Sequence, residues 1–272
     1  MECQCVAEAL TAVSVLSSEN IFLQPHREQE KIHAAQVHKH FLIRDGDLPT
    51  LIHIYELWCK AKKDKTWTKK NYLSQRALQL ACNIREQLGH LLTKLGIDIQ
   101  ITSWPDKKEN FIKCLLLGLS LNVAQKVESV DLQTSSNSRH HNNNNSAMMT
   151  KTVNGKSYTF STNNQQQQYK NGGGSNKGGL IVAGNGKDDN APYRTIRGHQ
   201  PVHIHPSSVL FSMINSKKLP PFVVYADLLT TSKQYMRNVT MIDGDWLPEL
   251  FPQNFSKIDT STTTAANASL RR

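Results

Sequence analysis

The chain has 272 residues and a formal net charge of +10, and 38% of its residues are hydrophobic. That length suits one or two domains with real cores. The charge favours a polyanionic partner such as RNA, DNA or an acidic membrane surface, although basic surfaces also keep proteins soluble. No run reaches the 18 or so apolar residues of a membrane span. The first residues also lack the basic and apolar regions of a secretory signal peptide, so we expect no membrane as a partner.

The cysteines are odd in number and scattered, which argues against a disulfide framework. Cys82 and Cys114 lie in apolar patterns, as buried thiols of a reducing compartment do. Cys3 and Cys5 are too close together and too isolated to form a zinc knuckle. Cys59 completes the set of five.

Residues 1 to about 125 show the periodicity of helices. Apolar residues at Leu10, Val13 and Leu16 begin the first stripe. Asp47 is placed to cap the next helix, and Pro49 is tolerated in a first helical turn. The apolar positions of that helix recur at helical spacing: Leu51, Ile54, Tyr55 and Trp58.

The longest predicted helix carries one apolar stripe in steps of three and four residues. Gly96 is its expected stop. A second apolar run, from Phe111 to Val123, predicts a helix that leads into a strand. The stripe of the long helix consists of Leu73, Ala77, Leu80, Ala81, Ile84, Leu88, Leu91 and Leu95.

Residues 131–191 have a different composition, with runs of Asn at 142–145 and of Gln at 165–168 and a Gly-rich stretch at 172–179. Such a segment cannot bury enough apolar surface to offset the entropy of ordering it. We therefore predict a disordered insertion. A short strand at 156–160 is the alternative within it.

From Tyr193 onward the pattern is that of short strands separated by Pro and Lys turns. The expected strand segments are 202–205, 209–211, 222–225 and 235–242, rich in β-branched and aromatic residues. This spacing predicts a small barrel. Residues 245–251 then predict a short closing helix.

One phrase in this half, His-Ile-His-Pro-Ser-Ser at 203–208, admits two interpretations. Both imidazoles of a His-x-His strand face the same side and could bind a metal ion. No third ligand cluster accompanies them. The alternative is that the imidazoles and hydroxyls form hydrogen bonds with a backbone, either that of the protein or that of a nucleic acid.

Four phrases follow one another in a specific order. After His-Pro-Ser-Ser come Val-Tyr-Ala-Asp-Leu at 224–228, Thr-Ser-Lys-Gln-Tyr-Met-Arg at 231–237 and Ile-Asp-Gly-Asp-Trp-Leu at 242–247. Together they resemble the C-terminal OB-fold domain of DEAH-box RNA helicases. Asp227 stands where that family more usually has glutamate, a mild departure.

The helical half is similar to the helicase-associated, or ratchet, domain of the same family, and the resemblance covers about residues 5–127 and 192–255. It implies an α+β fold: an all-helical ratchet-type bundle at 1–110, then a small OB-fold β-barrel at 111–257. The long disordered insertion at 131–191 would expand an early hairpin of that barrel, which is tolerable because closure entropy grows slowly with loop length. Residues 258–272 are expected to form a flexible tail.

The residues that this family uses for ATP hydrolysis have no counterpart here. The nearest match to a phosphate-binding loop is Gly155-Lys156-Ser157, but Thr150 occupies the place of its first glycine. No Asp-Glu-Ala-His sequence occurs in these 272 residues. Met1 lies just before the first expected ratchet helix, so we expect the winged-helix domain that precedes this helix in the family to be missing. We therefore expect no catalytic residues and no bound ATP or Mg²⁺, the cofactors of the family. Whether the chain counts as an enzyme stays open.

The resemblance implies RNA as a partner, since the ratchet and OB domains complete the RNA channel beside the helicase motor. In the barrel, Lys233, Tyr235 and Arg237 are the first candidates, because OB-folds bind single strands with cations and stacking aromatic rings. His205, Ser207 and Ser208 are second candidates, with a structural role as the alternative.

Further candidates lie in the helical half. Arg76 and Arg85 share a broad face of the long helix, and an ion pair with Glu86 or simple solvation is the alternative. A loop rich in lysine is either a solvated surface or a phosphate contact. Its residues are Lys60, Lys62, Lys63, Lys65, Lys69 and Lys70.

The leading interpretation is a C-terminal accessory portion of an ATP-dependent RNA helicase that binds RNA and lacks ATPase activity by itself. Two alternatives stay open. One is a stand-alone interaction module that docks on helicase motor domains or their regulatory proteins, and the other is an incomplete gene model of a full helicase. The family suggests RNA processing in the nucleus or nucleolus, with the cytoplasm as the alternative.

Overall fold

The computed structural model describes residues 3–127, 148–153, 156–161, 192–211, 219–253 and 255–257. They fall into two compact units. The first comprises Met1–Lys126 and Pro192–Asp243, and the second comprises Val127–Ala191 and Gly244–Arg272. No helix in the described ranges is long and apolar enough to cross a membrane.

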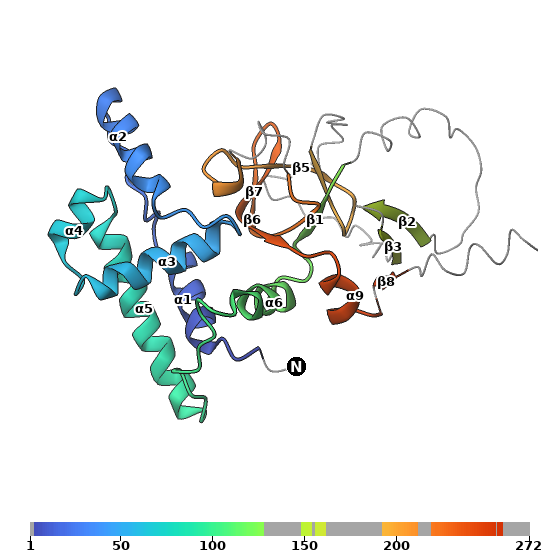
Figure 1. The fold of residues 1–272 in the computed structure, drawn as a ribbon, viewed down its shortest axis with the longest axis horizontal. Coiled ribbons are helices and arrows are strands. Elements are labelled where there is room, and N and C mark those ends of the chain that lie inside the picture. The colour runs from blue at the N-terminus through green and yellow to red at the C-terminus, as the bar shows by residue number, and fades with distance from the viewer. Residues whose placement is uncertain are drawn as a thin grey trace, which may run out of the picture. The chain divides into compact units, whose positions relative to one another are not determined.

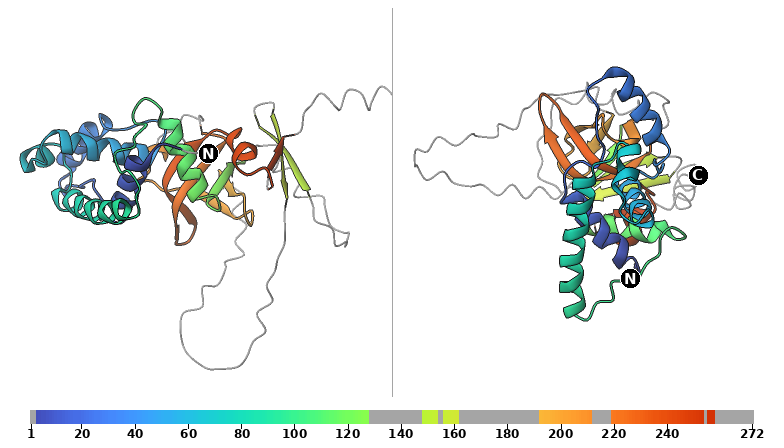
Figure 2. Two further views of the ribbon diagram at one scale, coloured as in Figure 1. Left: turned by 90° about the horizontal axis from the view of Figure 1, so that it is seen from below. Right: turned by 90° about the vertical axis from the view of Figure 1, so that its left-hand side faces the viewer.

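The first unit begins with helices and continues into a barrel, as Figures 1 and 2 show. Side-chain caps begin two of the helices. The Asp64 carboxylate accepts hydrogen bonds from the backbone N–H groups of Thr66 and Trp67, and the Ser74 hydroxyl accepts one from Ala77. The helices are α1 (Val6–Leu16), α2 (Glu28–Lys39), α3 (Asp47–Lys60), α4 (Lys65–Lys70), α5 (Gln75–Lys94) and α6 (Lys108–Gly118).

The helical core forms around α3 and the first half of α5. Trp58 is fully buried there, as its helical spacing predicts, and its indole N–H donates to the Gln75 side chain over 3.1 Å. Tyr55 packs beside it with ring centroids 5.8 Å apart. The other buried members of this core are Val15, Ile21, Phe41, Ile54, Leu73, Ala77, Leu78, Ala81 and Cys82.

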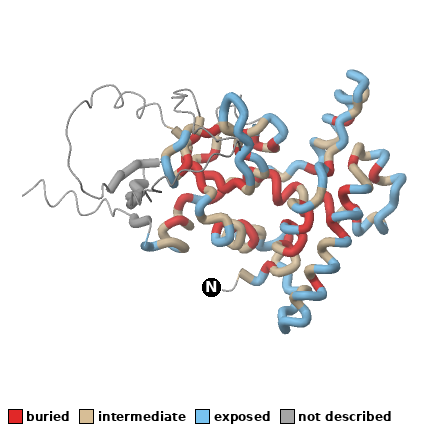
Figure 3. Tube along the Cα trace, turned by 180° about the vertical axis from the view of Figure 1, so that it is seen from behind, coloured by how far each residue is buried: buried red, intermediate tan, exposed pale blue. Residues whose placement is uncertain are grey.

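Of the predicted stripe of α5, only Leu73, Ala77 and Ala81 are buried, and Leu80 is already 38% exposed. Leu91 and Leu95 are 56% and 74% exposed, and Gly96 ends the helix with a left-handed φ of +76°. Figure 3 shows this far end of α5 and most of α2 as exposed segments. Helical periodicity identifies the apolar face, but burial also needs a neighbouring element, and the last turns of α5 extend beyond the core.

The barrel is closed by β1 (Val123–Lys126), β4 (Tyr193–Thr195), β5 (Pro201–Ile204), β6 (Phe222–Thr230) and β7 (Gln234–Ile242), in the spatial order β1-β4-β5-β7-β6. The pairs are antiparallel except for β5 with β7, which is parallel. Inward residues alternate along the strands and form one core. It contains Ala124, Tyr193, Val202, Ile204, Leu210, Val223, Tyr225, Met236 and Val239.

One predicted strand is a turn of 3₁₀ helix instead. Residues Val209–Phe211 form η1, although their β-branched and aromatic character favours a strand. The Ser208 side chain explains the difference, because its hydroxyl accepts the backbone N–H of Leu210 at 3.2 Å and so stabilises a turn.

The start of α3 touches the barrel directly. Gly46 forms an isolated antiparallel bridge with Thr240 of β7, and the Met241 N–H donates to the Asp45 carbonyl over 2.8 Å. Gly46 has a φ of +133°, and a Cβ there would lie 2.3 Å from the Val239 carbonyl oxygen. Only glycine fits this approach.

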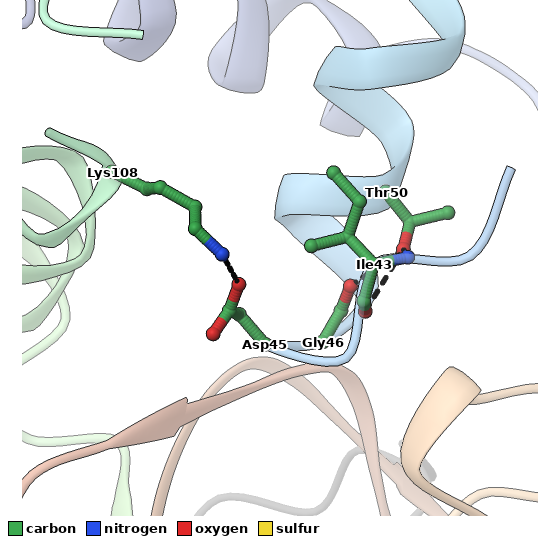
Figure 4. A network of polar contacts seen from close by, with 5 residues as sticks. All are labelled: Ile43, Asp45, Gly46, Thr50 and Lys108. Atoms are coloured by element: carbon green, nitrogen blue, oxygen red, sulfur yellow. Dashed lines mark hydrogen bonds and ion pairs between the residues drawn. The ribbon is translucent and has the colours of Figure 1, made fainter. Parts of the chain in front are cut away.

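Side chains brace the same loop from both sides (Figure 4). The Thr50 hydroxyl donates to the Gly46 carbonyl over 2.8 Å and accepts the Ile43 N–H over 2.9 Å. Lys108, in the first turn of α6, donates to the Asp45 carboxylate. The helices and the barrel of the first unit are therefore joined by specific hydrogen bonds and an ion pair as well as by apolar packing.

In the second unit, β2 (Met148–Val153), β3 (Lys156–Ser161) and β8 (Phe255–Lys257) form a three-stranded sheet in the order β2-β3-β8. α9 (Trp246–Leu250) matches the predicted closing helix. Two strands thus lie inside the segment predicted to be disordered. β3 matches the short strand at 156–160 that was the alternative to disorder, whereas β2 was not predicted. β3 pairs with β2 on one side and with β8, about a hundred residues later, on the other. The rest of 131–191 and the predicted tail at 258–272 lie outside the described residues.

Candidate nucleic-acid interface

Strands β5 and β7 place the sequence-predicted barrel residues on one outer face. Their parallel register sets His203 beside Tyr235 and Ile204 beside Met236. Ile204 and Met236 are buried in the core. Because side chains alternate along a strand, the outer face receives His203 and Tyr235, followed by Arg237.

Three aromatic rings meet on this face. The ring centroid of Tyr235 lies 5.7 Å from that of His203 and 5.9 Å from that of His205. The His203 ring is tilted by 42° to the phenol and the His205 ring meets it edge-on at 84°. Such contacts hold the phenol in place without covering it. Tyr235 is only partly buried.

Ser207 orients the His205 ring. Its hydroxyl lies 2.7 Å from His205 Nδ1, and its backbone N–H donates to the same nitrogen over 3.2 Å. Nδ1 is thus an acceptor, which leaves the proton of the neutral ring on Nε2. Burial, with the nearby positive charge of Arg237, lowers the pKa of His205 and so favours this neutral form.

Cations extend the face along the β6–β7 hairpin. Arg237 is exposed opposite Asp227 of β6, whose carboxylate accepts a hydrogen bond from the Asn238 side chain over 3.0 Å. Lys233 lies in the exposed turn, where its carbonyl accepts the N–H of Thr231 over 2.9 Å. The outer face therefore presents the Tyr235 ring for stacking, the neutral imidazole of His205, and the positive charges of Arg237 and Lys233.

Ser208, a further predicted site residue, has a structural position. It is 7% exposed, and its hydroxyl donates to Asp47 Oδ1 over 3.0 Å. The backbone N–H of Val209 donates to the same oxygen over 2.7 Å, and that of Val239 donates to Oδ2 over 2.7 Å. One carboxylate of α3 thus binds both η1 and β7 of the barrel.

The prediction that Asp47 caps α3 is wrong, because its side chain points out of the helix and into the barrel. No side chain caps this helix, and Gly46 occupies the cap position. Burial raises the pKa of Asp47 to about 6, against the lowering effect of the three hydrogen bonds. We call this contact of Asp47 with Ser208, Val209 and Val239 the joint between the helices and the barrel. The sequence does not predict it, because the partners of Asp47 lie more than 160 positions away.

The two arginine candidates of the helical half lie on α5, apart from β5 and β7 (Figure 1). Arg76 forms an ion pair with Glu19 at 3.0 Å and stays 82% exposed. Arg85 donates through Nε to the Thr11 hydroxyl of α1 over 3.0 Å. Glu86, the predicted alternative partner, pairs with Lys63 instead at 3.7 Å. The structure therefore does not bring these arginines to the Tyr235 face.

The lysine-rich loop spans the end of α3 and all of α4, and its six lysines are exposed. Lys62 and Lys63 both have left-handed φ values, of 54° and 58°. Lys63 donates to the Cys82 sulfur over 3.0 Å, which raises the pKa of the lysine. The described part of the chain holds no cluster of three or more His, Cys, Asp or Glu residues that could bind a metal ion.

With this geometry in view, a family model described as the oligonucleotide/oligosaccharide-binding (OB)-fold matches residues 112–254, more than half of the chain. The chain belongs to this OB-fold family. A second model, described as the ratchet-like helicase associated domain (HA2), matches residues 1–51 of this OB-fold protein. Both matches agree with the helices and the closed barrel of the first unit.

Curated relatives of the OB-fold protein include RNA helicases. The probable ATP-dependent RNA helicase DHX35 of Homo sapiens is 28% identical over 253 residues, which cover 93% of this chain and 26% of the relative. The ATP-dependent RNA helicase DHX33 of Mus musculus is 27% identical with the same coverage. The resemblance to the ratchet and OB-fold region of DEAH-box RNA helicases is confirmed. The chain spans about a quarter of the length of these relatives.

Proposed function

We propose that this chain is a C-terminal accessory portion of a DEAH-box ATP-dependent RNA helicase and that it binds single-stranded RNA on the outer face of β5 and β7. The observation that carries the proposal is the parallel register of these strands, which surrounds Tyr235 with His203 and His205 and continues to Arg237. OB-folds bind single strands by this combination of stacking rings and cations.

Each residue has a chemical role in this proposal. A base stacks on the phenol of Tyr235, which the two imidazoles hold from the side. Arg237 and Lys233 attract the phosphates, and the Nε2–H of His205 donates to a phosphate or ribose oxygen. Ser207 acts through His205, because its hydroxyl and its backbone N–H both donate to Nδ1 and so select the tautomer with the proton on Nε2.

The test is a salt titration of RNA affinity, measured by fluorescence anisotropy with an oligouridine of about 16 nucleotides, the upper size of one OB-fold site. Tyr235→Ala removes the stacking surface and weakens binding by about 5- to 140-fold, the equivalent of about 1–3 kcal/mol. Tyr235→Phe keeps the ring and stays within about twofold of the wild type.

The phosphate contact is tested by Arg237→Gln. It lowers the affinity and reduces the slope of log affinity against log salt by about 0.7, the value for one phosphate of a single strand. Arg27→Gln, which removes a highly exposed arginine of the helical half, is the matched control and leaves the slope unchanged. Wild-type affinity and slope in both Tyr235→Ala and Arg237→Gln would exclude RNA binding through this face.

We further propose that the chain holds no nucleotide and hydrolyses no ATP by itself. In its nearest match to a phosphate-binding loop, Lys156 and Ser157 lie in strand β3. A phosphate cradle needs a loop that opens into a helix N-terminus. An RNA-stimulated release of phosphate from ATP above background would contradict this part of the proposal and leave the RNA face untouched.

A further inference from the structure

Three of the five cysteines converge from distant parts of the chain. Cys5 directly precedes α1, and Cys114 lies in the middle of α6. The Cys5 thiol lies 3.8 Å from the carbonyl oxygen of Asn110, one helical turn before Cys114. The Cys114 side chain interacts with the thiols of both Cys5 and Cys3. Figure 2 shows the start of α1 beside α6.

The three thiols differ in access and in charge. Cys5 is 3% exposed, whereas Cys3 and Cys114 are partly exposed. Hydrogen bonding from Cys5, with help from Cys3, lowers the pKa of Cys114 to about 7, although burial and the charge of Glu8 act in the opposite direction. The same hydrogen bond and burial raise the pKa of Cys5. Cys114 is therefore the most acidic of the three thiols.

A partly exposed, acidic thiol beside a buried thiol is the arrangement of a redox-active cysteine with its resolving partner. We propose that Cys114 and Cys5 form an oxidative modification site that takes hydroperoxides and ends in a reversible disulfide between the two residues. The substrate is a small hydroperoxide such as hydrogen peroxide, because the pair lies between helices and only Cys114 and Cys3 reach solvent.

The chemistry balances in two steps. The Cys114 thiolate attacks one peroxide oxygen, so that an S–O bond forms, the O–O bond breaks, and the departing oxygen takes up a proton and leaves as water. The Cys5 thiol then attacks the sulfenic sulfur, an S–S bond forms, and hydroxide leaves with the thiol proton as a second water. Each sulfur loses one electron, and the peroxide gains two.

The disulfide would tie the beginning of α1 to α6, the helix that leads into β1 of the barrel. It would close a loop of about 110 residues, which restricts the unfolded chain and so stabilises the folded one. The crosslink lies in the helical part and does not involve the Tyr235 face. The inference is therefore independent of the proposed RNA binding.

The other two cysteines provide an internal reference. Cys59 is exposed as a residue, but its pKa is raised, and the main cause is the partial burial of its thiol. Cys82 is 2% exposed and donates its thiol proton to Glu86 over 3.2 Å. If exposure alone decided reactivity, Cys59 would react first, whereas the thiol cluster predicts Cys114.

The experiment treats the full chain with hydrogen peroxide at pH 7, blocks the remaining thiols with iodoacetamide and analyses non-reduced peptides by mass spectrometry. The expected product is a Cys5–Cys114 peptide pair that dithiothreitol separates. It disappears in Cys114→Ser and in Cys5→Ala, and it persists in Cys3→Ser and in the control Cys59→Ser. The oxidised wild type melts about 5–10 °C higher than the reduced one.

Without peroxide, iodoacetamide alkylates Cys114 faster than Cys59 at pH 7, and the half-maximal rate for Cys114 lies near that pH. If Cys5→Ala does not fold, Cys114→Ser carries the test, since Cys114 is only partly buried. A Cys3–Cys114 pair as the main product, alkylation of Cys59 ahead of Cys114, or no crosslink at all would each overturn the assignment.

Discussion

Two polar regions of the barrel use the same segment of chain in opposite ways. Ser207 and Ser208 are neighbours, yet Ser207 is exposed and orients His205, while Ser208 is buried and donates to Asp47. The outer face presents rings and cations to solvent. The inner joint satisfies one buried carboxylate with three donors. Adjacent hydroxyls thus serve binding and architecture, and substitutions should separate the two.

The largest expected effect comes from Gly46→Ala at the joint. The new methyl group would meet the Val239 carbonyl oxygen at 2.3 Å, in a backbone conformation with φ of +133°. We expect a loss of about 3–5 kcal/mol in the free energy of unfolding, measured by urea denaturation.

Two other glycines separate the causes. Gly96→Ala has a φ of +76° but no atom within 4 Å of the added methyl group, so it should cost about 1 kcal/mol. Gly118→Ala, with nothing within 4 Å, should be neutral or slightly stabilising. Equal losses in all three variants would mean that the close approach at Gly46 has no energetic weight.

Asp47→Ala comes next in size. It leaves the Ser208 hydroxyl and the N–H groups of Val209 and Val239 buried without their acceptor. We expect a loss of about 3 kcal/mol, less than the sum of three broken hydrogen bonds, because the burial of a charge is relieved at the same time. Urea denaturation, followed by far-ultraviolet circular dichroism, measures this change in the free energy of unfolding. A change below about 0.5 kcal/mol would contradict the stabilising role of Asp47.

The barrel and the site were predictable to different depths. The four ordered phrases of the second half predict the OB-fold barrel, and helical spacing predicts Trp58 as a core residue, because both signals are local. The sequence predicts the neighbours of Tyr235 only in part. It makes His205 and Tyr235 separate candidates, and their contact depends on the parallel register of β5 and β7, which no local pattern specifies.

The joint was not predictable at all. Asp47 precedes an apolar helical run, and local rules assign such a residue to a cap. Its true partners are brought to it by the closure of the barrel, more than 160 positions later. The predicted burial of the last turns of α5 is wrong for the same reason, since an amphipathic pattern does not say whether a neighbouring element covers the apolar face.

The pH dependence of Asp47 sharpens the comparison. Burial raises its pKa from an ordinary 3.8 to about 6 in the folded state, so the folded protein binds more protons between these values. Its contribution to stability is therefore complete below pH 4 and is lost as the pH rises through 6, by at most about 3 kcal/mol. The difference in unfolding free energy between wild type and Asp47→Asn, measured from pH 4 to 8, should fall across this window. A constant difference would contradict the raised pKa.

The smallest expected effect tests the two serines directly. Ser208→Ala removes the hydroxyl that donates to Asp47 and accepts from Leu210, and it should cost about 1–2 kcal/mol of stability without changing the affinity for oligouridine. Ser207→Ala removes only the exposed hydroxyl beside His205 Nδ1, so its unfolding free energy should stay within about 0.5 kcal/mol of the wild type. Its RNA affinity should fall about two- to fivefold, because the imidazole loses the partner that fixes its orientation.

Measured side by side, Ser208→Ala should lower stability and leave RNA affinity unchanged, and Ser207→Ala should lower RNA affinity and leave stability unchanged. If Ser207→Ala lowered stability as much as Ser208→Ala, the outer face would be part of the same structural network as the joint. The proposed division between binding and architecture within residues 203–208 would then be wrong.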